Sequence, residues 1–319
     1  RQMRIGRGLL LWAAVVGLVG LFAAFIPILT LGFCSSLEFC AESGVREMFA
    51  GSYVVDSFSL VMKGLFIVSA LLAILISVGY LESGRFYEGE FYFLLLASVF
   101  GAVVMASSRD LITIFVALEL VTAPTFLMAA WRKGDPRSNE AALKFFIVGV
   151  IASSLLLFGM ALLYGTTGET TFAGISAGSA AWVAEPVFAI AVLFTLLGFA
   201  FKVSAAPFHF WTPDTYEGAP APVGAYLSVI SKTAGFVGLL TFTFLAFGEV
   251  REIWGPVLGV LAAVSIVLGN FVALKQKNML RMLGYSSIAQ GGFMLVPLGA
   301  AAAESATAAQ LQQAFFATV

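Results

Sequence analysis

Long apolar runs separated by short polar loops dominate the chain. A helix needs about 20 apolar residues to cross the ~30 Å hydrocarbon core of a bilayer. Nine runs meet or approach this length, and a tenth begins near residue 305. The nine runs are 9–31, 57–80, 91–107, 111–131, 141–165, 186–203, 219–247, 253–274 and 279–300. This pattern predicts an all-α, polytopic transmembrane helix bundle with about nine complete spans and part of a tenth.

The two ends of the chain predict a piece of a longer protein. The first residue is Arg1 rather than Met, and the last residues stop inside an apolar run. The opening RQMRIGR and the run after it are similar to a secretory signal, but the run to Leu31 is too long and no A-x-A site follows. We therefore expect a spanning helix at 9–31 and a chain truncated at both ends.

Basic residues are unevenly distributed between alternate loops. One set of loops holds ten of them: Arg1, Arg4, Arg7, Arg85, Arg132, Lys133, Arg137, Lys275, Lys277 and Arg281. The other set holds three: Arg46, Arg109 and Arg251. Because cytoplasmic loops carry an excess of Lys and Arg, the richer side is predicted to be cytoplasmic, with residue 1 on it.

The composition excludes several classes of protein. The chain is 60% hydrophobic and 11% charged, with a mean hydropathy of +0.99, whereas soluble domains carry about 25% charged residues. Seventeen basic against 18 acidic residues leave no surplus to bind nucleic acid. Cys34, Cys40 and His209 are too few for a cysteine-held cluster or a bis-histidine haem, so redox centres are expected on other chains. Whether the two cysteines pair or stay free is left open.

Four ionisable residues fall where hydrocarbon is expected. They are Glu119, Lys144, Lys202 and Lys232. A charge inside a membrane is costly, and such residues commonly mark ion or proton paths. A carboxylate and several lysines whose proton affinities depend on one another satisfy the physical requirement for passing protons.

Simpler interpretations exist for Lys144 and for Lys63, a further lysine within a predicted span. Lys144 stands four residues after Glu140, so an i,i+4 ion pair accounts for it equally well. Lys63 can extend along its own stem to the interface, which is the interpretation we favour for it. Glu119 and Lys232 lie too deep for that, although Glu119 could be a purely structural partner of a lysine.

The stretch KVSAAPFHFWTPDTYEGAPAP, residues 202–222, cannot form one continuous helix. It contains Pro207, Pro213, Gly218, Pro220 and Pro222. Broken helices at membrane depth line cavities or water-filled paths and mark binding sites in transporters. An ordinary cytoplasmic loop beginning after Lys202 is the alternative. His209, the single histidine, has an ordinary pKa suited to proton transfer, but a lone histidine is more often structural.

Several segments together resemble the antiporter-like membrane subunits of respiratory complex I. They are FVALEL around Glu119, EAALKFF around Lys144, GFAFKVSAAPFHFWTPDTYEGAPAPV around Lys202 and His209, and KNMLRMLGYSSIA. The resemblance covers most of residues 89–292. The stretch LSVISKTAGF has Lys232 where larger members of the family show a histidine-bearing HAATMV-like stretch. In this respect the chain resembles the subunit-N branch of the family.

The resemblance implies a fold and a set of site residues. Family members have about fourteen helices and two inverted five-helix repeats, each with a broken helix. Residues 1–88 would then be flanking N-terminal helices, and residues 89–319 a truncated core holding the first repeat and the start of the second. Glu119 and Lys202 match the family's glutamate–lysine pair. Lys144 and Lys232 match lysines of the inward proton path, and His209 the histidine beside the break; the second-repeat lysine would lie beyond residue 319.

The implied function is proton translocation as a subunit of a bacterial NADH:quinone oxidoreductase in the inner membrane. This chain would hold no cofactor and no metal. NADH, FMN, iron–sulfur clusters and quinone would belong to partner subunits, and its neighbours would be lipid and other membrane subunits, including sister antiporter-like subunits. Three alternatives stay open: a subunit of a multisubunit sodium/proton antiporter, a subunit of a membrane-bound hydrogenase, or a structural membrane subunit without its own proton path.

Overall fold

The computed structural model describes residues 15–23, 26, 45–84, 89–179 and 181–301, and these are overwhelmingly helical. The two strands within these ranges are β1 (Arg46–Met48) and β2 (Tyr53–Val55), an antiparallel hairpin with Met48 opposite Tyr53. Residues 15–23 are helical. The rest of the predicted 9–31 span, Cys34, Cys40 and the run near residue 305 lie outside the described residues.

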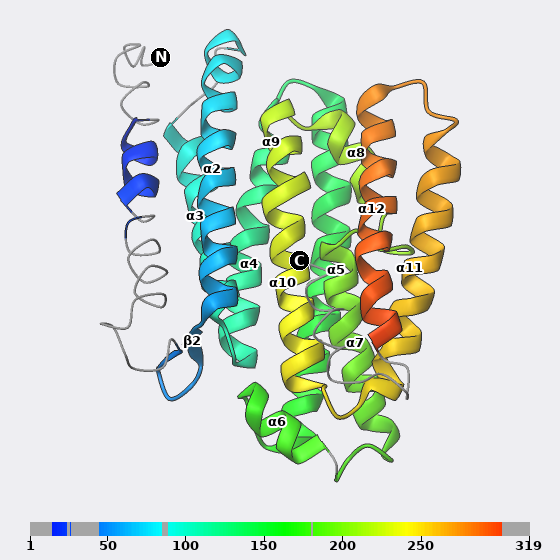
Figure 1. Ribbon diagram of the computed structural model, residues 1–319. Coiled ribbons are helices and arrows are strands. Elements are labelled where there is room, and N and C mark those ends of the chain that lie inside the picture. The colour runs from blue at the N-terminus through cyan, green and yellow to red at the C-terminus, as the bar shows by residue number, and fades with distance from the viewer. Residues whose placement is uncertain (1–14, 24–25, 27–44, 85–88, 180, 302–319) are drawn as a thin grey trace.

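The remaining elements are helices that follow one another through short loops. In chain order they are α2 (Ser57–Gly84), α3 (Gly89–Ser107), α4 (Leu111–Ala129), α5 (Pro136–Thr167), α6 (Phe172–Ser179), α7 (Pro186–Lys202), α8 (Trp211–Gly218), α9 (Ala221–Tyr226), η2 (Leu227–Ser231), α10 (Lys232–Thr241), η3 (Phe242–Ala246), α11 (Arg251–Ala273) and α12 (Met279–Ala301). The segments η2 and η3 are π-helical, and with α9 and α10 they make one continuous rod. The all-α bundle predicted from the apolar runs is confirmed (Figure 1).

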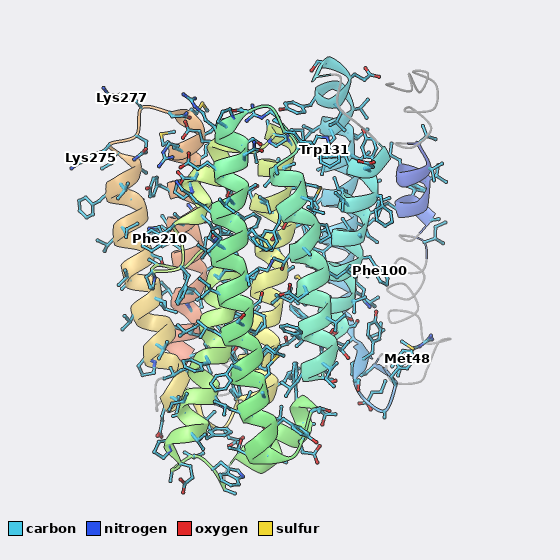
Figure 2. All side chains as sticks on the ribbon, turned by 180° about the vertical axis from the view of Figure 1, so that it is seen from behind. Met48, Phe100, Trp131, Phe210, Lys275 and Lys277 are labelled. Atoms are coloured by element: carbon cyan, nitrogen blue, oxygen red, sulfur yellow. The ribbon has the colours of Figure 1, made fainter. Side chains whose placement is uncertain are left out.

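Six helices of the described ranges are long and apolar enough to cross a membrane. They are Ser57–Ser83, Gly89–Ser107, Leu111–Ala129, Pro136–Thr167, Ala221–Ala246 and Arg251–Ala273. The predicted run at 91–107 forms α3, which is one of the six. The predicted run at 279–300 forms α12, which is not among them. Apolar residues cover much of the outer surface of these helices, as Phe100 illustrates in Figure 2.

The loops gather at two ends of the bundle. Trp131, Lys275 and Lys277 lie at one end and Met48 at the other (Figure 2). Arg132 donates a 2.6 Å hydrogen bond to the carbonyl of Gly218, so the loop before α9 belongs to the first end. We call the end formed by residues 130–135, 218–220 and 274–278 the basic end, because basic side chains predicted to share one side meet there.

The connector at 166–185, which lies between two of the predicted spans, contains a helix. Gly168, with a φ of 72°, ends α5, and α6 begins four residues later. Phe172 and Ile175 are one turn apart on α6 and both are buried. The ring of Phe172 packs 4.7 Å from that of Phe242. Burial of this small apolar face explains why a Gly-, Ala- and Ser-rich segment is helical.

Helix α5 is the support on which the broken segment rests. Its 32 residues span roughly 48 Å at 1.5 Å per residue, and both α7 and α8 pack along it. Helix α8 packs on α12 as well, while α10 contacts α7. The α7–α8 segment therefore lies inside the bundle between α5, α10 and α12 (Figure 1).

Candidate functional site

The break between α7 and α8 lies in the interior of the bundle. Helix α7 ends at Lys202, and α8 starts at Trp211. Residues 203–206 are at most 1% exposed, and Ser204 has a φ of 59°, in the left-handed region. Pro213 sits in the first turn of α8, where a missing N–H costs no helical hydrogen bond. The helix is therefore broken between Lys202 and Trp211. The first part of the break is buried, whereas Pro207 and Phe210 are exposed.

Lys202 is a buried ammonium group at the end of α7. Its side chain is 3% exposed, and Nζ has no hydrogen-bond partner in the described chain. The ring of Phe201 lies 5.9 Å from Nζ. The carbonyl end of a helix carries partial negative charge, which favours a cation in its last turn. That dipole offsets only part of the cost of burying a charge.

Glu119 lies near Lys202 but does not touch it. It projects from α4, is half-buried, and its Oε1 accepts a 2.5 Å hydrogen bond from Ser153 of α5. The carboxylate interacts electrostatically with Lys202. No ion pair within 4 Å joins the two among the described residues. The charges of the two groups can therefore influence each other without a contact that holds them together.

Lys232 begins α10 directly after the π-helical segment η2. Its side chain is 8% exposed. Nζ donates to the carbonyl of Ser287 at 2.7 Å and to its Oγ at 2.5 Å. π-Helical turns inside longer helices occur frequently at functional sites. Ser287 was not among the predicted site residues. The sequence signal that could have identified it is the polar run Tyr285–Ser287 inside the apolar run 279–300.

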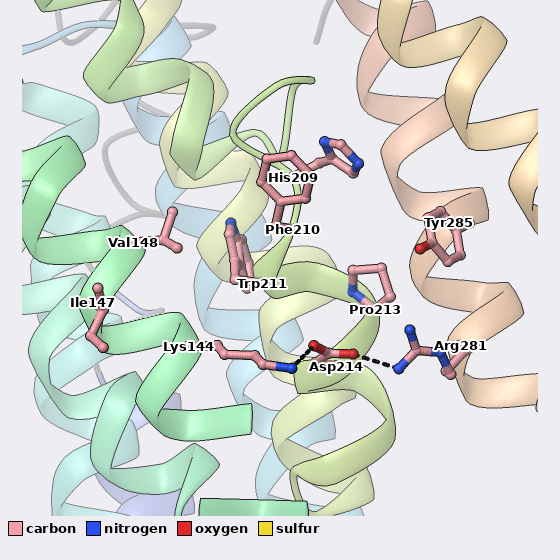
Figure 3. A pocket seen from close by; sticks show the side chains of 10 residues that line it. All are labelled: Lys144, Ile147, Val148, His209, Phe210, Trp211, Pro213, Asp214, Arg281 and Tyr285. Carbon is pink, nitrogen blue, oxygen red and sulfur yellow. Dashed lines mark hydrogen bonds and ion pairs between the residues drawn. The ribbon is translucent and has the colours of Figure 1, made fainter. Parts of the chain in front are cut away.

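Lys144 belongs to an ion-pair cluster near the basic end. Nζ lies 2.6 Å from Glu140, the predicted i,i+4 pair, and 2.7 Å from Asp214 of α8. Arg281 of α12 pairs with the same Asp214 and, at 3.0 Å, with Glu217. Figure 3 shows the carboxylate of Asp214 between Lys144 and Arg281. The cluster joins α5, α8 and α12, and its two longer-range partners, Asp214 and Arg281, had no signal in the local sequence.

A cavity of about 490 Å³ connects this cluster with the break. Lys144, Asp214 and Arg281 line one part of it, and His209 and Phe210 line another (Figure 3). His209 is 5% exposed, and its ring lies 4.6 Å from that of Phe210. The structure thus brings His209 and Lys144 to one cavity, while Glu119, Lys202 and Lys232 do not line it. Within the described ranges no three His, Cys, Asp or Glu side chains come together as a metal site requires.

Residues 108–319 match the model of the NADH:quinone oxidoreductase/Mrp antiporter transmembrane family. The chain belongs to this family. The subunit N 2 of NADH-quinone oxidoreductase from Streptomyces griseus is 43% identical over 304 residues, which cover 93% of this chain and 56% of that protein. The subunit N of NADH-quinone oxidoreductase from Moorella thermoacetica is 42% identical over 80% of this chain and 54% of its own length.

Two solved structures of other proteins contain chains with the same fold as this antiporter-family chain. A chain of respiratory complex I from Thermus thermophilus with bound aureothin superposes with a TM-score of 0.72 at 35% identity, over 91% of this chain and 59% of that one. A chain of the Mrp complex from a Dietzia species gives 0.82 at 20% identity, over 97% and 57%, which shows the fold alone. The chain spans a little over half the length of the relatives it matches.

Two glycines of this antiporter-family chain let α12 lie directly against the broken segment. A Cβ on Gly284 would come within 2.9 Å of Pro213 Cα, and one on Gly291 within 2.7 Å of the Val203 carbonyl oxygen. Both distances are shorter than van der Waals contact. The two glycines share one face of α12 because they are seven residues apart. That face carries Ser287 between them.

Gly291→Ala is expected to lower stability by roughly 1–3 kcal/mol, because α12 must move away from the break to relieve the overlap. Thermal unfolding of the purified protein in detergent measures this loss. Gly259→Ala is the matched control, since a Cβ at Gly259 of α11 meets nothing within 4 Å, and alanine improves a helix by about 0.5–1 kcal/mol over glycine. Equal unfolding temperatures for the two variants would contradict the close approach of α12 to the broken segment at Gly291.

Proposed function

We propose that this chain is the proton-translocating, antiporter-like subunit of a bacterial NADH:quinone oxidoreductase, of the subunit-N type. Two lines of support carry the proposal. The relatives at 42–43% identity bear that name. The single structural observation is the buried ammonium of Lys202, at a helix break, influenced by Glu119 without touching it.

In this proposal electrons pass through partner subunits that hold NADH, FMN, iron–sulfur clusters and quinone, and this chain moves protons. A signal from those partners changes the charge interaction between Glu119 and Lys202, and Lys202 then gains or loses a proton. Moving one charge against 100 mV costs about 2.3 kcal/mol. At an effective dielectric constant of ~20, two unit charges ~4 Å apart interact by about 4 kcal/mol and more distant charges by less, so an interaction of this kind is of the required order.

The other residues would connect this step with the two sides of the membrane. His209 and Lys144, which share a cavity, would bring protons toward the break. Lys232 would pass them on toward the second repeat, whose lysine is expected beyond residue 319. We place the basic end on the cytoplasmic side, because ten of the basic residues belong to loops on that side.

Residues 89–319 would form the translocating core, with 1–88 flanking it and sister antiporter-like subunits and lipid around it. A structural subunit without a proton path is the main rival. That alternative needs buried charges held in direct pairs. Lys144 touches two carboxylates but is exposed. Lys202 is buried and touches none among the described residues. A sodium/proton antiporter subunit ranks below the proposal, because the Mrp likeness at 20% identity concerns the fold alone.

The proposal is tested by isolating the full-length protein with its natural partners through an affinity tag and reconstituting the complex in vesicles. Addition of NADH and a quinone is expected to start both NADH oxidation and proton uptake. Exchange of sodium for protons without any response to NADH would favour the antiporter alternative and contradict the proposal.

A further inference from the structure

A chain of hydroxyl groups leads away from Lys232. Its Nζ lies 2.5 Å from Ser287 Oγ, and Ser287 Oγ lies 3.2 Å from the hydroxyl of Tyr216 on α8. The side chain of Ser228 lies close enough to Tyr216 to interact with it, while its Oγ donates a 2.8 Å hydrogen bond to the carbonyl of Ala225. Ser228 is partly exposed and lies in η2, one turn before Lys232 and nearer the basic end. Hydroxyls from α12, α8 and η2 therefore lead from the buried amine toward a partly exposed serine.

We propose that Tyr216 and Ser287 form a proton relay between Lys232 and Ser228. The relay rests on the proposed function and adds to it a second approach to the buried lysines from the basic end. It is separate from the cavity, because none of Lys232, Ser287, Tyr216 and Ser228 lines that cavity.

The hydrogen bonds define the order in which a proton moves along the relay. Outward, the ammonium of Lys232 gives one proton to Ser287 Oγ, which passes its own proton to the oxygen of Tyr216. Tyr216 passes its proton to Ser228 Oγ, which releases its own proton, otherwise donated to the carbonyl of Ala225, toward the basic end. Each hydroxyl gains one proton and loses one, and Lys232 is left neutral; loading Lys232 is the reverse sequence.

The packing of α12 holds the relay in place. Gly284 and Gly291 bring α12 into contact with the broken segment on either side of Ser287. Arg281, on the same helix, is bound to Asp214 and Glu217 of α8, the helix that carries Tyr216. The Ser287 carbonyl gives Lys232 a second acceptor at 2.7 Å, so the amine stays beside the hydroxyl. Tilting of α8 relative to α12 would open the contact between Tyr216 and Ser287 and stop the relay.

Substitutions that remove one oxygen at a time test the relay in the full-length protein within its complex. Ser287→Ala and Tyr216→Phe are each expected to lower NADH-driven proton uptake about tenfold, since a positioned proton-transfer group commonly contributes ~10²–10⁴-fold and the cavity supplies a second approach. Ser287→Thr keeps a hydroxyl and is expected to stay within roughly twofold of the wild type. Ser286→Ala is the matched control, because Ser286 is exposed on the same helix.

The outcomes separate the relay from the proposed function. Normal uptake in Tyr216→Phe overturns the relay even if Ser287→Ala is impaired, because Ser287 would then only hold Lys232. Failure of Ser287→Thr to restore uptake overturns it as well. Normal uptake in both variants, with loss in Lys232→Met, overturns the relay and leaves the proposed function standing. Normal uptake in Lys232→Met counts against both.

Discussion

Complex carrying Lys202→Met is expected to assemble at normal levels and to lose most of its NADH-driven proton uptake. Met fills nearly the volume of the lysine stem, so the core around the break stays packed. Removing a buried ammonium that has no partner within the described chain relieves a desolvation cost of several kcal/mol. Thermal stability should therefore be unchanged or higher, while uptake falls at least about tenfold, the lower range for loss of a proton-transfer group.

Lys63→Met is the matched control for this variant. Lys63 is also a buried membrane lysine, 6% exposed, but its Nζ donates to the hydroxyl of Tyr53 at 3.0 Å, next to the hairpin at the opposite end. Uptake in this control should match the wild type. Loss of assembly in Lys202→Met with a normal Lys63→Met would favour the structural role for Lys202. The amount of complex in the membrane and the rate of uptake decide between the two.

Glu119→Gln is expected to assemble normally and to lower proton uptake by roughly tenfold, which corresponds to about 1.4 kcal/mol of lost interaction. The Gln side chain keeps an oxygen that can accept the hydrogen bond of Ser153, so the local contact of α4 with α5 is preserved. Only the charge that acts on Lys202 is removed. In the proposed mechanism, the protonation of Lys202 then no longer responds to the partner subunits.

Ser153→Ala provides the converse change. It removes the 2.5 Å hydrogen bond and leaves the charge of Glu119 in place, so its effect on uptake should be clearly smaller than that of Glu119→Gln. A larger effect in Ser153→Ala would show that the hydrogen bond, not the charge, is what matters. Simultaneous records of NADH oxidation and vesicle acidification provide the comparison.

The helices and the break could be predicted from the sequence because their signals are local. The apolar runs follow from bilayer thickness. The close grouping of four prolines and Gly218 within residues 202–222 favours a break, although single prolines lie inside α4, α11 and α12. The i,i+4 geometry of Glu140 and Lys144 is also fixed by the helix itself. These features needed no knowledge of which segments meet in the fold.

The partners of the buried charges could not be predicted, because they come from distant parts of the chain. Asp214 reaches Lys144 across 70 residues, and Ser287 reaches Lys232 across 55. Such contacts depend on how α8 and α12 pack, which the glycines of α12 permit but do not specify. The π-helical turn before Lys232 has no distinctive amino-acid composition. Helix α6 gave no clear helical signal because its segment is rich in small residues.

Glu119 and Lys202 are expected to act as one unit in proton transfer, although no ion pair within 4 Å joins them among the described residues. The most direct measurement is a double-mutant cycle of NADH-driven proton uptake with the wild type, Glu119→Gln, Lys202→Met and the double variant. If the claim holds, each single substitution impairs uptake strongly and the double variant is no worse than Lys202→Met alone. Independent effects that multiply in the double variant, or normal uptake in Lys202→Met, would contradict it.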